Sequence, residues 1–281
     1  IVPYVDWQPF FNAWEMKGSF PDILNAPSTG PAARKLFEDA QDMLRRVIDE
    51  RWLTANAVVG LFPANAVGDS VEVYTDESRT EVAHRLHMLR QQGQHREGVP
   101  NRSLADFVAP KESGLPDHVG AFAVTGGLGS AEHVARLKAE LDDYSAILLE
   151  SLADRLAEGL AEMLHERVRR ELWGYSPDEQ LDNRQLIKEQ YDGIRPAPGY
   201  PACPEHTEKA TLWEMLDVDE IGMELTDRMA MWPGASVSGW YLGHPDSQYF
   251  VVGRIGRDQV EDYAQRKGWT LKEAETWLSP N

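Results

Sequence analysis

The sequence predicts an α+β fold built around an antiparallel sheet. Helical and strand patterns follow one another without the regular alternation that a doubly wound parallel sheet requires. Residues 223–256 are rich in aromatic and β-branched residues, and Pro-Gly and His-Pro-Asp-Ser interrupt them as turn signals, which is typical of antiparallel strands. With 281 residues, 42% of them hydrophobic, the chain can bury a sizeable core as one large domain or two small ones.

Four segments in the first half of the chain carry a pattern. Residues 31–51 place apolar residues at helical spacing and predict an amphipathic helix. Residues 57–76 contain two β-branched runs around Gly68-Asp69 and predict a hairpin. Residues 79–92 fit a helix or a strand. Residues 117–127 are apolar, short and bounded by glycines, so they predict a buried strand.

The strongest pattern predicts one long helix in the middle of the chain. Apolar residues recur at every fourth position and therefore share one face: Leu148, Leu152, Leu156, Leu160, Leu164, Val168 and Leu172. An acidic row lies two positions out of phase, nearly opposite: Asp154, Glu158, Glu162 and Glu166. Pattern alone favours a solvated face for this acidic row. Further helices are predicted at 205–217 and as a pair over 257–280, the first of the pair ending at Gly268.

The chain is strongly acidic, with 28 Lys and Arg against 46 Asp and Glu and a net charge of −18. A surface this negative repels phosphate backbones and anionic lipid, so we expect neither nucleic acid nor a membrane as a partner. A single cysteine allows no internal disulfide, which suits a cytoplasmic location. The sequence opens on Ile1 without a secretory pattern, and we expect it to be a piece of a longer protein.

Two short motifs suggest chemistry but fit it poorly. Residues 125–130, TGGLGS, resemble a phosphate-binding turn, but Glu132 stands where the dinucleotide motif has its third glycine, so a structural turn is favoured. Cys203 and His206 have the spacing of metal ligands, yet a closed zinc site needs two more ligands of this kind. Nothing argues for a reactive thiol. The sequence predicts neither a metal site nor a catalytic nucleophile.

The stretch RPAPGYPACPEHTEK, residues 195–209, predicts a stiff, irregular loop, because proline lacks an N–H and disfavours helix in the residue before it. Arg195 offers a planar fork for a carboxylate, and Tyr200 a flat face with a polar tip. The prolines would hold backbone groups ready for a ligand at Ala197, Gly199 and Ala202. The loop is a candidate cradle for a small amphoteric molecule. The alternative is a rigid connector with a helix-capping arginine.

This loop, together with YVDWQPFF, MWPGASVSGWY and HPDSQYF, closely resembles the C-terminal activation domain of cobalamin-dependent methionine synthase. The resemblance covers essentially the whole chain, including VVGLFPAN, LADFVAPK, ADRLAEGLAEMLHERVR and RDQVEDYAQRKG. It implies that residues 1–281 form one C-shaped α+β activation domain with a twisted antiparallel sheet. It also implies a shallow groove for S-adenosylmethionine, unlike the Rossmann-like methyltransferases.

The resemblance further implies a function. The parent enzyme of that family makes methionine from homocysteine and methyltetrahydrofolate, with cobalamin and zinc in other modules. This domain would bind S-adenosylmethionine and present its methyl to cob(II)alamin during reductive remethylation. Its partners would be the cobalamin-binding module of the same chain and a flavodoxin or diflavin reductase. The isolated domain is expected to bind the ligand without turning over alone.

Matching motifs imply the residues that hold the ligand. Asp6 would pair with its ammonium and Arg195 with its carboxylate. Tyr249 and Phe250 would flank the adenosine, and Tyr200 would face the cobalt. The other expected contacts are Glu158, Glu189, Ala197, Gly199 and Ala202. No catalytic base is expected, because the acceptor is a reduced metal and the work of the domain is positioning.

Two other functions stay open on the sequence. One is a docking module that caps the cobalamin unit and recruits the reductase. The other is a free-standing small-molecule methyltransferase, against which the lack of a base argues. Loss of ligand binding in an Arg195→Ala variant, with docking intact, separates a ligand-binding module from a docking module.

Overall fold

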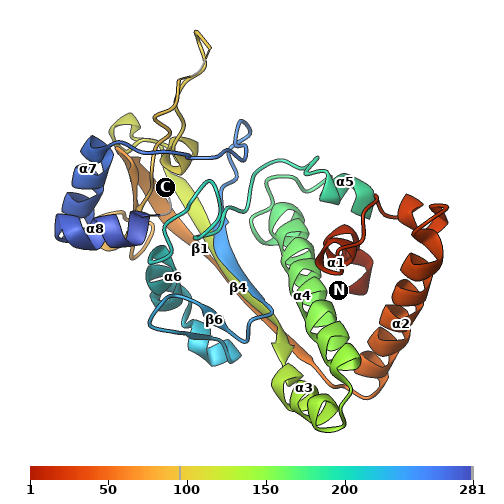
Figure 1. The fold of residues 1–281 in the computed structure, drawn as a ribbon. Coiled ribbons are helices and arrows are strands. Elements are labelled where there is room, and N and C mark those ends of the chain that lie inside the picture. The colour runs from red at the N-terminus through yellow and green to blue at the C-terminus, as the bar shows by residue number, and fades with distance from the viewer. Residues whose placement is uncertain (95, 280–281) are drawn as a thin grey trace.

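The computed structural model describes residues 1–94 and 96–279. A five-stranded antiparallel sheet in the order β3-β2-β1-β4-β7 runs through its centre (Figure 1). Its strands are β1 (Thr54–Val67), β2 (Ser70–Tyr74), β3 (Val82–His87), β4 (Asp117–Leu128) and β7 (Ser236–Tyr241). Two short strands, β5 (Glu224–Leu225) and β6 (Met231–Trp232), form a separate ribbon. The predicted α+β class and the antiparallel sheet are confirmed.

Within the described residues the chain forms eight α-helices: α1 (Gln8–Ala13), α2 (Gly30–Asp49), α3 (Ser130–Ala139), α4 (Asp143–Arg167), α5 (Asn183–Ile187), α6 (Glu208–Leu216), α7 (Arg257–Lys267) and α8 (Leu271–Leu278). The helices predicted at 31–51 and 205–217 and the C-terminal pair are confirmed. Gly268 ends α7 in the left-handed conformation, as expected. Of these helices, none is both long and apolar enough to cross a membrane.

The predicted hairpin is confirmed, and the ambiguous segment is resolved. β1 and β2 pair from Val67 opposite Ser70, with the turn between them at Gly68-Asp69. Residues 79–92 contain a strand, β3, which pairs with β2. The expectation of strands over 223–256 is right only as far as Tyr241, since residues 244–256 form no strand.

The long central helix packs across the sheet and carries most of the predicted apolar ridge. Asp142 caps the N-terminus of α4, since its carboxylate accepts the N–H of Ser145 at 3.0 Å. Leu160, Leu164 and Val168 pack with Phe122 and Tyr241 of the sheet. The ridge ends early: Leu172 is 45% exposed, because a π-helical turn at Val168–Leu172 adds a residue to the turn and rotates it away.

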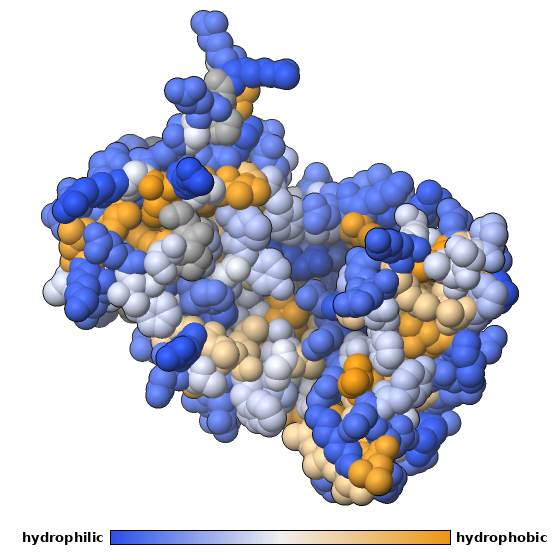
Figure 2. Space-filling model, in the orientation of Figure 1, coloured by the Kyte–Doolittle hydropathy of each residue, from blue (hydrophilic) through white to orange (hydrophobic). Residues whose placement is uncertain are grey.

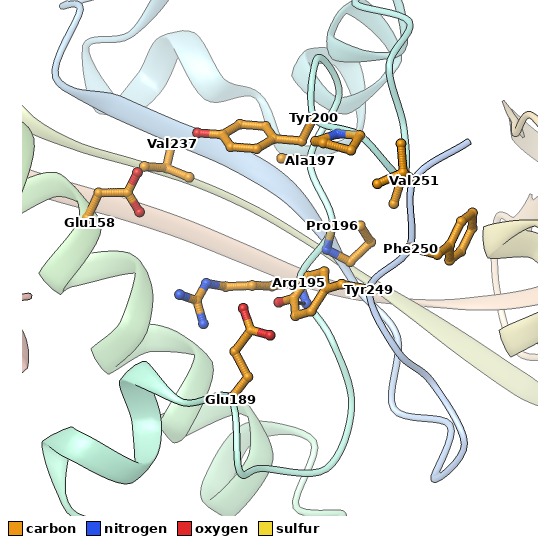
Figure 3. Close-up of a pocket in the computed structure, with 12 residues that line it drawn as sticks. Glu158, Glu189, Arg195, Pro196, Ala197, Tyr200, Val237, Tyr249, Phe250 and Val251 are labelled. Carbon is orange, nitrogen blue, oxygen red and sulfur yellow. Dashed lines mark hydrogen bonds between the residues drawn. The ribbon is translucent and has the colours of Figure 1, made fainter. Parts of the chain in front are cut away.

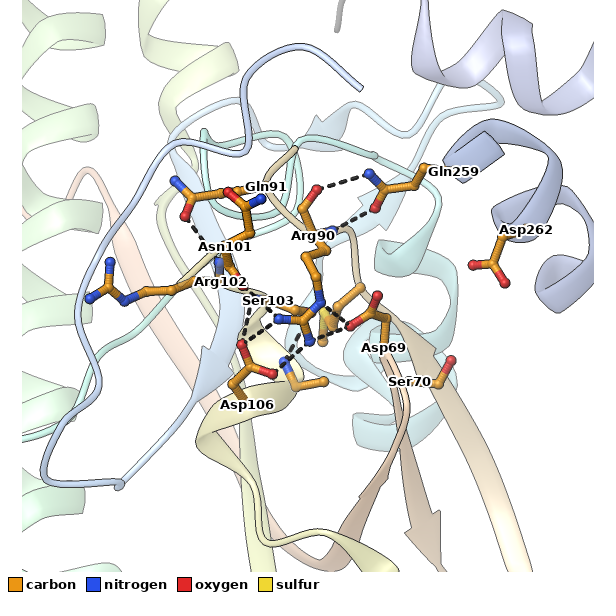
Figure 4. Close-up of polar contacts among 12 residues, drawn as sticks. Asp69, Ser70, Arg90, Gln91, Asn101, Arg102, Ser103, Asp106, Gln259 and Asp262 are labelled. Atoms are coloured by element: carbon orange, nitrogen blue, oxygen red, sulfur yellow. Dashed lines mark hydrogen bonds and ion pairs between the residues drawn. The ribbon is translucent and has the colours of Figure 1, made fainter. Parts of the chain in front are cut away.

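The other face of the sheet is covered by α6, so the sheet lies between two helical layers (Figure 1). At the far end of the sheet, α7 is fixed by a polar cluster around Arg90 (Figure 4). The guanidinium of Arg90 contacts the carboxylates of Asp69 and Asp106 at 2.6 Å each. The backbone N–H of Arg90 donates to the side-chain oxygen of Gln259 in α7, and the side-chain nitrogen of Gln259 donates to the backbone carbonyl of Arg90. These contacts tie the C-terminal helices to the turn that opens β2.

Candidate ligand-binding groove

The proline-rich loop lies against the open edge of the sheet. β7 is the last strand in the sheet order, and Ile194 and Leu242 exchange two backbone hydrogen bonds of 3.0 Å beside it. The N–H of Trp240 donates to the carbonyl of Pro196 at 2.8 Å. The chain therefore continues the sheet for a few residues before it turns away. The irregular backbone predicted for 195–209 is confirmed as far as Thr207, because α6 begins at Glu208.

Gly239 makes this close approach possible. A Cβ at this position would lie 2.4 Å from the carbonyl oxygen of Pro196 and 3.2 Å from the Cα of Ala197. Both are backbone atoms, which cannot move aside as a flexible side chain could. The absence of a side chain at Gly239 thus sets the position of the loop.

A Gly239→Ala variant is expected to push the loop off β7. Overpacking of this kind costs about 1–3 kcal/mol of unfolding free energy, and the displaced Arg195 should weaken ligand binding as well. Denaturant unfolding and calorimetric titration measure the two effects. Gly234→Ala is the control, since nothing lies within 4 Å of its Cβ. If the Gly239→Ala and Gly234→Ala variants have equal stability and equal ligand affinity, Gly239 does not set the position of the loop.

Inside the loop, Gly199 forms a turn and does not serve the groove. Its φ is +95°, and its N–H donates to the carbonyl of Cys203 at 2.7 Å. A Cβ there would lie 2.3 Å from the imidazole of His206. The expectation that the Gly199 N–H is held free for a ligand is therefore wrong, because the loop uses it internally. Cys203 is buried, and burial raises the pKa of its thiol.

Beside the loop lies a groove of about 410 Å³ between α4, the loop and the segment after β7 (Figures 2 and 3). Its walls are Glu158, Glu189, Arg195, Pro196, Ala197, Tyr200, Pro201, Ala202, Val237, Tyr249, Phe250 and Val251. A second hollow of about 370 Å³ shares Glu158, Glu189 and Arg195 with it and adds Asp6, Arg155 and Glu162. Arg195 thus stands at the junction of the two. The structure brings together nine of the ten expected site residues around them, and leaves Gly199 out.

Arg195 is held from several sides. Its Nη2 lies 2.8 Å from Oε2 of Glu162, and its Nη1 donates to the hydroxyl of Tyr191 at 3.0 Å and to Nδ1 of His165 at 3.3 Å. Its backbone N–H donates to the hydroxyl of Tyr249 at 3.0 Å. Burial alone would lower the pKa of Arg195, but Tyr191 and Glu162 outweigh it and raise that pKa above its usual range. The guanidinium therefore stays charged.

The carboxylates around Arg195 make the site acidic overall. Burial raises the pKa of Glu189, while Arg195 opposes this shift. The second hollow is lined by four carboxylates and two cations. The carboxylates are those of Asp6, Glu158, Glu162 and Glu189, and the cations are Arg155 and Arg195. An arrangement of one fixed guanidinium among several carboxylates suits a small ligand that carries a carboxylate and more than one positive charge.

Two aromatic residues expected to flank a ligand lie side by side but differ in their contacts. The Tyr249 hydroxyl is bonded to the backbone of Arg195, whereas the Phe250 ring lies 6.5 Å from that of Phe107. Figure 3 shows the Phe250 ring turned away from Arg195. Neighbours in an extended chain project to opposite sides.

Sequence reasoning missed three side chains that contact Arg195. Glu162 was expected on a solvated face but is only 7% exposed, because the proline-rich loop covers this part of α4. His165 is fully buried, and burial together with Arg195 and Arg169 lowers its pKa well below the usual value, so its imidazole is neutral. No pattern in the sequence indicated that Tyr191 contacts Arg195. For Glu162 and His165 the available signal was their spacing of three residues on one helix.

The comparisons with known proteins identify the family of this chain. The family model described as "Vitamin B12 dependent methionine synthase, activation domain" matches residues 1–268. A solved structure described as the MetH reactivation domain bound to AdoHcy is similar to this chain with a TM-score of 0.97 and 57% sequence identity. That match covers 100% of this chain and 86% of the other. The chain belongs to the family of activation domains of vitamin B12-dependent methionine synthase.

Proposed function

We propose that this chain binds S-adenosylmethionine in the groove beside the proline-rich loop and presents its methyl group to the cobalamin of a neighbouring module. The observation that carries the proposal is the fixed guanidinium of Arg195 among the carboxylates of Asp6, Glu158 and Glu189. The AdoHcy bound by the similar structure differs from S-adenosylmethionine by one methyl group and supports the same ligand class here.

The charges of the ligand match those of the groove. Its carboxylate would pair with Arg195, and its ammonium with Asp6 or Glu189. The sulfonium would lie toward Glu158, the adenosine beside Tyr249 and Phe250, and Tyr200 would face the cobalamin. Every charged group of the ligand would thus have an opposite charge within the two hollows, which share Glu158, Glu189 and Arg195.

The residues of the groove would act by positioning. Methyl transfer from a sulfonium to a reduced metal removes no proton, so the site needs no general base. The cobalamin of the neighbouring module, reduced by an electron from a flavodoxin or diflavin reductase, would accept the methyl group, and AdoHcy would be the leaving group, because the S–CH3 bond breaks with its electron pair on sulfur. Arg195 and Asp6 would fix the amino-acid end of the ligand and so aim its methyl outward.

Calorimetric titration of this chain with S-adenosylmethionine should show binding at one site, with AdoHcy as a competitor. In the whole enzyme, with its cobalamin module and a reductant, methyl-labelled S-adenosylmethionine should transfer its label to cobalamin. Binding without any label transfer would reject the donor role. An absence of binding would reject the site itself.

A docking role has its own support. Tyr200 is 55% exposed and Val251 is 62% exposed, and both lie on the rim of the groove. Exposed apolar side chains around a binding groove suit a partner surface. The two roles are compatible. A variant that no longer binds the ligand but still docks on the cobalamin module would show that docking does not depend on ligand binding.

A further inference from the structure

Arg195 owes its orientation to side chains of α4 and of the segment before the loop, which contact its guanidinium. A free arginine on a loop carries several rotatable bonds, and fixing them costs conformational entropy when a ligand binds. Here the guanidinium is already fixed by Glu162, His165 and Tyr191. The first two come from α4, one helical turn apart, and the third from the segment before the loop.

The pattern of contacts leaves one part of the guanidinium unused. Arginine has five N–H groups: two on Nη1, two on Nη2 and one on Nε. Both groups on Nη1 are directed to protein acceptors, Tyr191 and His165, and Nη2 is anchored by Glu162. No acceptor for Nε is found in the described part of the chain. The N–H on Nε is parallel to one of the two on Nη2, so a ligand carboxylate could bind both while the second N–H on Nη2 serves Glu162.

Tyr191 is itself clamped. The guanidinium of Arg169 lies 4.3 Å from the centre of its ring, and Arg195 lies on the same ring at 5.9 Å. The hydroxyl of Tyr191 also lies 3.4 Å from that of Tyr249, which accepts the backbone N–H of Arg195. His165 stacks on Tyr241 of β7 with ring centres 5.0 Å apart. The support of Arg195 therefore reaches into the core, where side chains have little freedom.

We propose that Glu162, His165 and Tyr191 are positioning residues, which occupy Nη1 and anchor Nη2 of Arg195 so that its Nε edge is presented to the carboxylate of the ligand. His165 and Tyr191 line neither of the two hollows, whereas Glu162 lines the second one, so Tyr191→Phe is the variant in which a direct contact with the ligand is not removed. The inference rests on the proposed function, since it assumes that Arg195 binds a carboxylate.

The test compares two ligands that differ in the amino-acid part. AdoHcy has the carboxylate, and 5′-methylthioadenosine lacks the whole amino-acid portion. Tyr191→Phe keeps the ring but removes the hydroxyl, and Glu162→Gln keeps the shape but removes the charge. Each variant should weaken AdoHcy binding by about tenfold and change 5′-methylthioadenosine binding by less than about twofold. Calorimetric titration of the 281-residue chain gives both constants.

Matched controls come from neighbours that do not contact Arg195. Tyr175→Phe removes a hydroxyl bonded to the backbone of Asp192, and Glu166→Gln removes a carboxylate paired with Arg170. Both controls should leave the ratio of the two affinities unchanged.

The outcomes separate this inference from the function on which it depends. If Arg195→Ala loses AdoHcy but Tyr191→Phe and Glu162→Gln weaken both ligands equally, the three residues are structural and the inference is wrong. If Arg195→Ala keeps full affinity for AdoHcy, the proposed site fails. A selective loss of AdoHcy in both test variants, with the controls unchanged, supports the positioning role.

Discussion

An Arg195→Ala variant is expected to bind S-adenosylmethionine at least about 100-fold more weakly than the wild type, a loss of about 2.8 kcal/mol. The variant would lose the two parallel charge-assisted hydrogen bonds that we propose between Arg195 and the ligand carboxylate, and each such bond is worth about 1.5–3 kcal/mol. Titration calorimetry with S-adenosylmethionine and AdoHcy measures the change. Affinity for 5′-methylthioadenosine, which lacks the carboxylate, should fall far less.

Arg195→Ala also leaves Glu162 without its cation, so its fold must be checked by thermal unfolding. Arg195→Lys avoids this problem, because it keeps a positive charge near Glu162 but lacks the planar fork. We expect about a tenfold loss of affinity for this variant. Arg170→Ala is the control, since the partly exposed Arg170 pairs with Glu166, one helical turn away, and not with a residue of the groove. Unchanged ligand affinity in Arg195→Lys would show that a charge suffices and that no bidentate contact exists.

The second large effect is expected on stability, from a buried ion pair between Arg169 and Glu179. Arg169 is fully buried and grips Glu179 through two hydrogen bonds of 2.7 Å. Arg169→Met would leave the carboxylate of Glu179, whose side chain is 7% exposed, without a counter-charge. Breaking a buried pair from one side costs about 3–5 kcal/mol of unfolding free energy. For a domain of this size, that corresponds to a fall in Tm of roughly 10 °C.

The control for this variant lies two residues away. Arg167 pairs with Glu171 at 3.1 Å, and both side chains are more than half exposed. Arg167→Met should cost less than about 1 kcal/mol. The double variant Arg169→Met with Glu179→Leu should recover most of the stability, because no charge is then left buried alone. If Arg169→Met unfolds like Arg167→Met, the buried pair does not stabilise the fold.

The local sequence predicted those elements whose pattern lies within one segment. The ridge of α4 and the hairpin at Gly68-Asp69 follow from the spacing of apolar residues and from turn chemistry, which tertiary contacts did not override. Residues 79–92 stayed ambiguous because a short apolar segment fits either period. Pairing with β2 decided for the strand.

The site was harder to predict, because its key contacts join segments far apart in the sequence. Periodicity placed Glu162 correctly opposite the leucine ridge, but it does not say what covers that face. The loop that begins at Arg195 covers it and turns a solvated carboxylate into a buried partner. The prediction for Gly199 failed because of a contact within the loop, where its N–H donates to the carbonyl of Cys203. The motif resemblance supplied Arg195, but not the residues behind it.

The position of the proline-rich loop on β7 has a consequence for solubility. An outer strand with unpaired N–H and C=O groups is a template for strand addition by another chain, and such addition leads to aggregation. Ile194 and Pro196 occupy these groups on Leu242 and Trp240. The segment that shapes the groove therefore also covers this edge of the sheet, so a shortened or loosened loop would favour aggregation as well as weaken ligand binding.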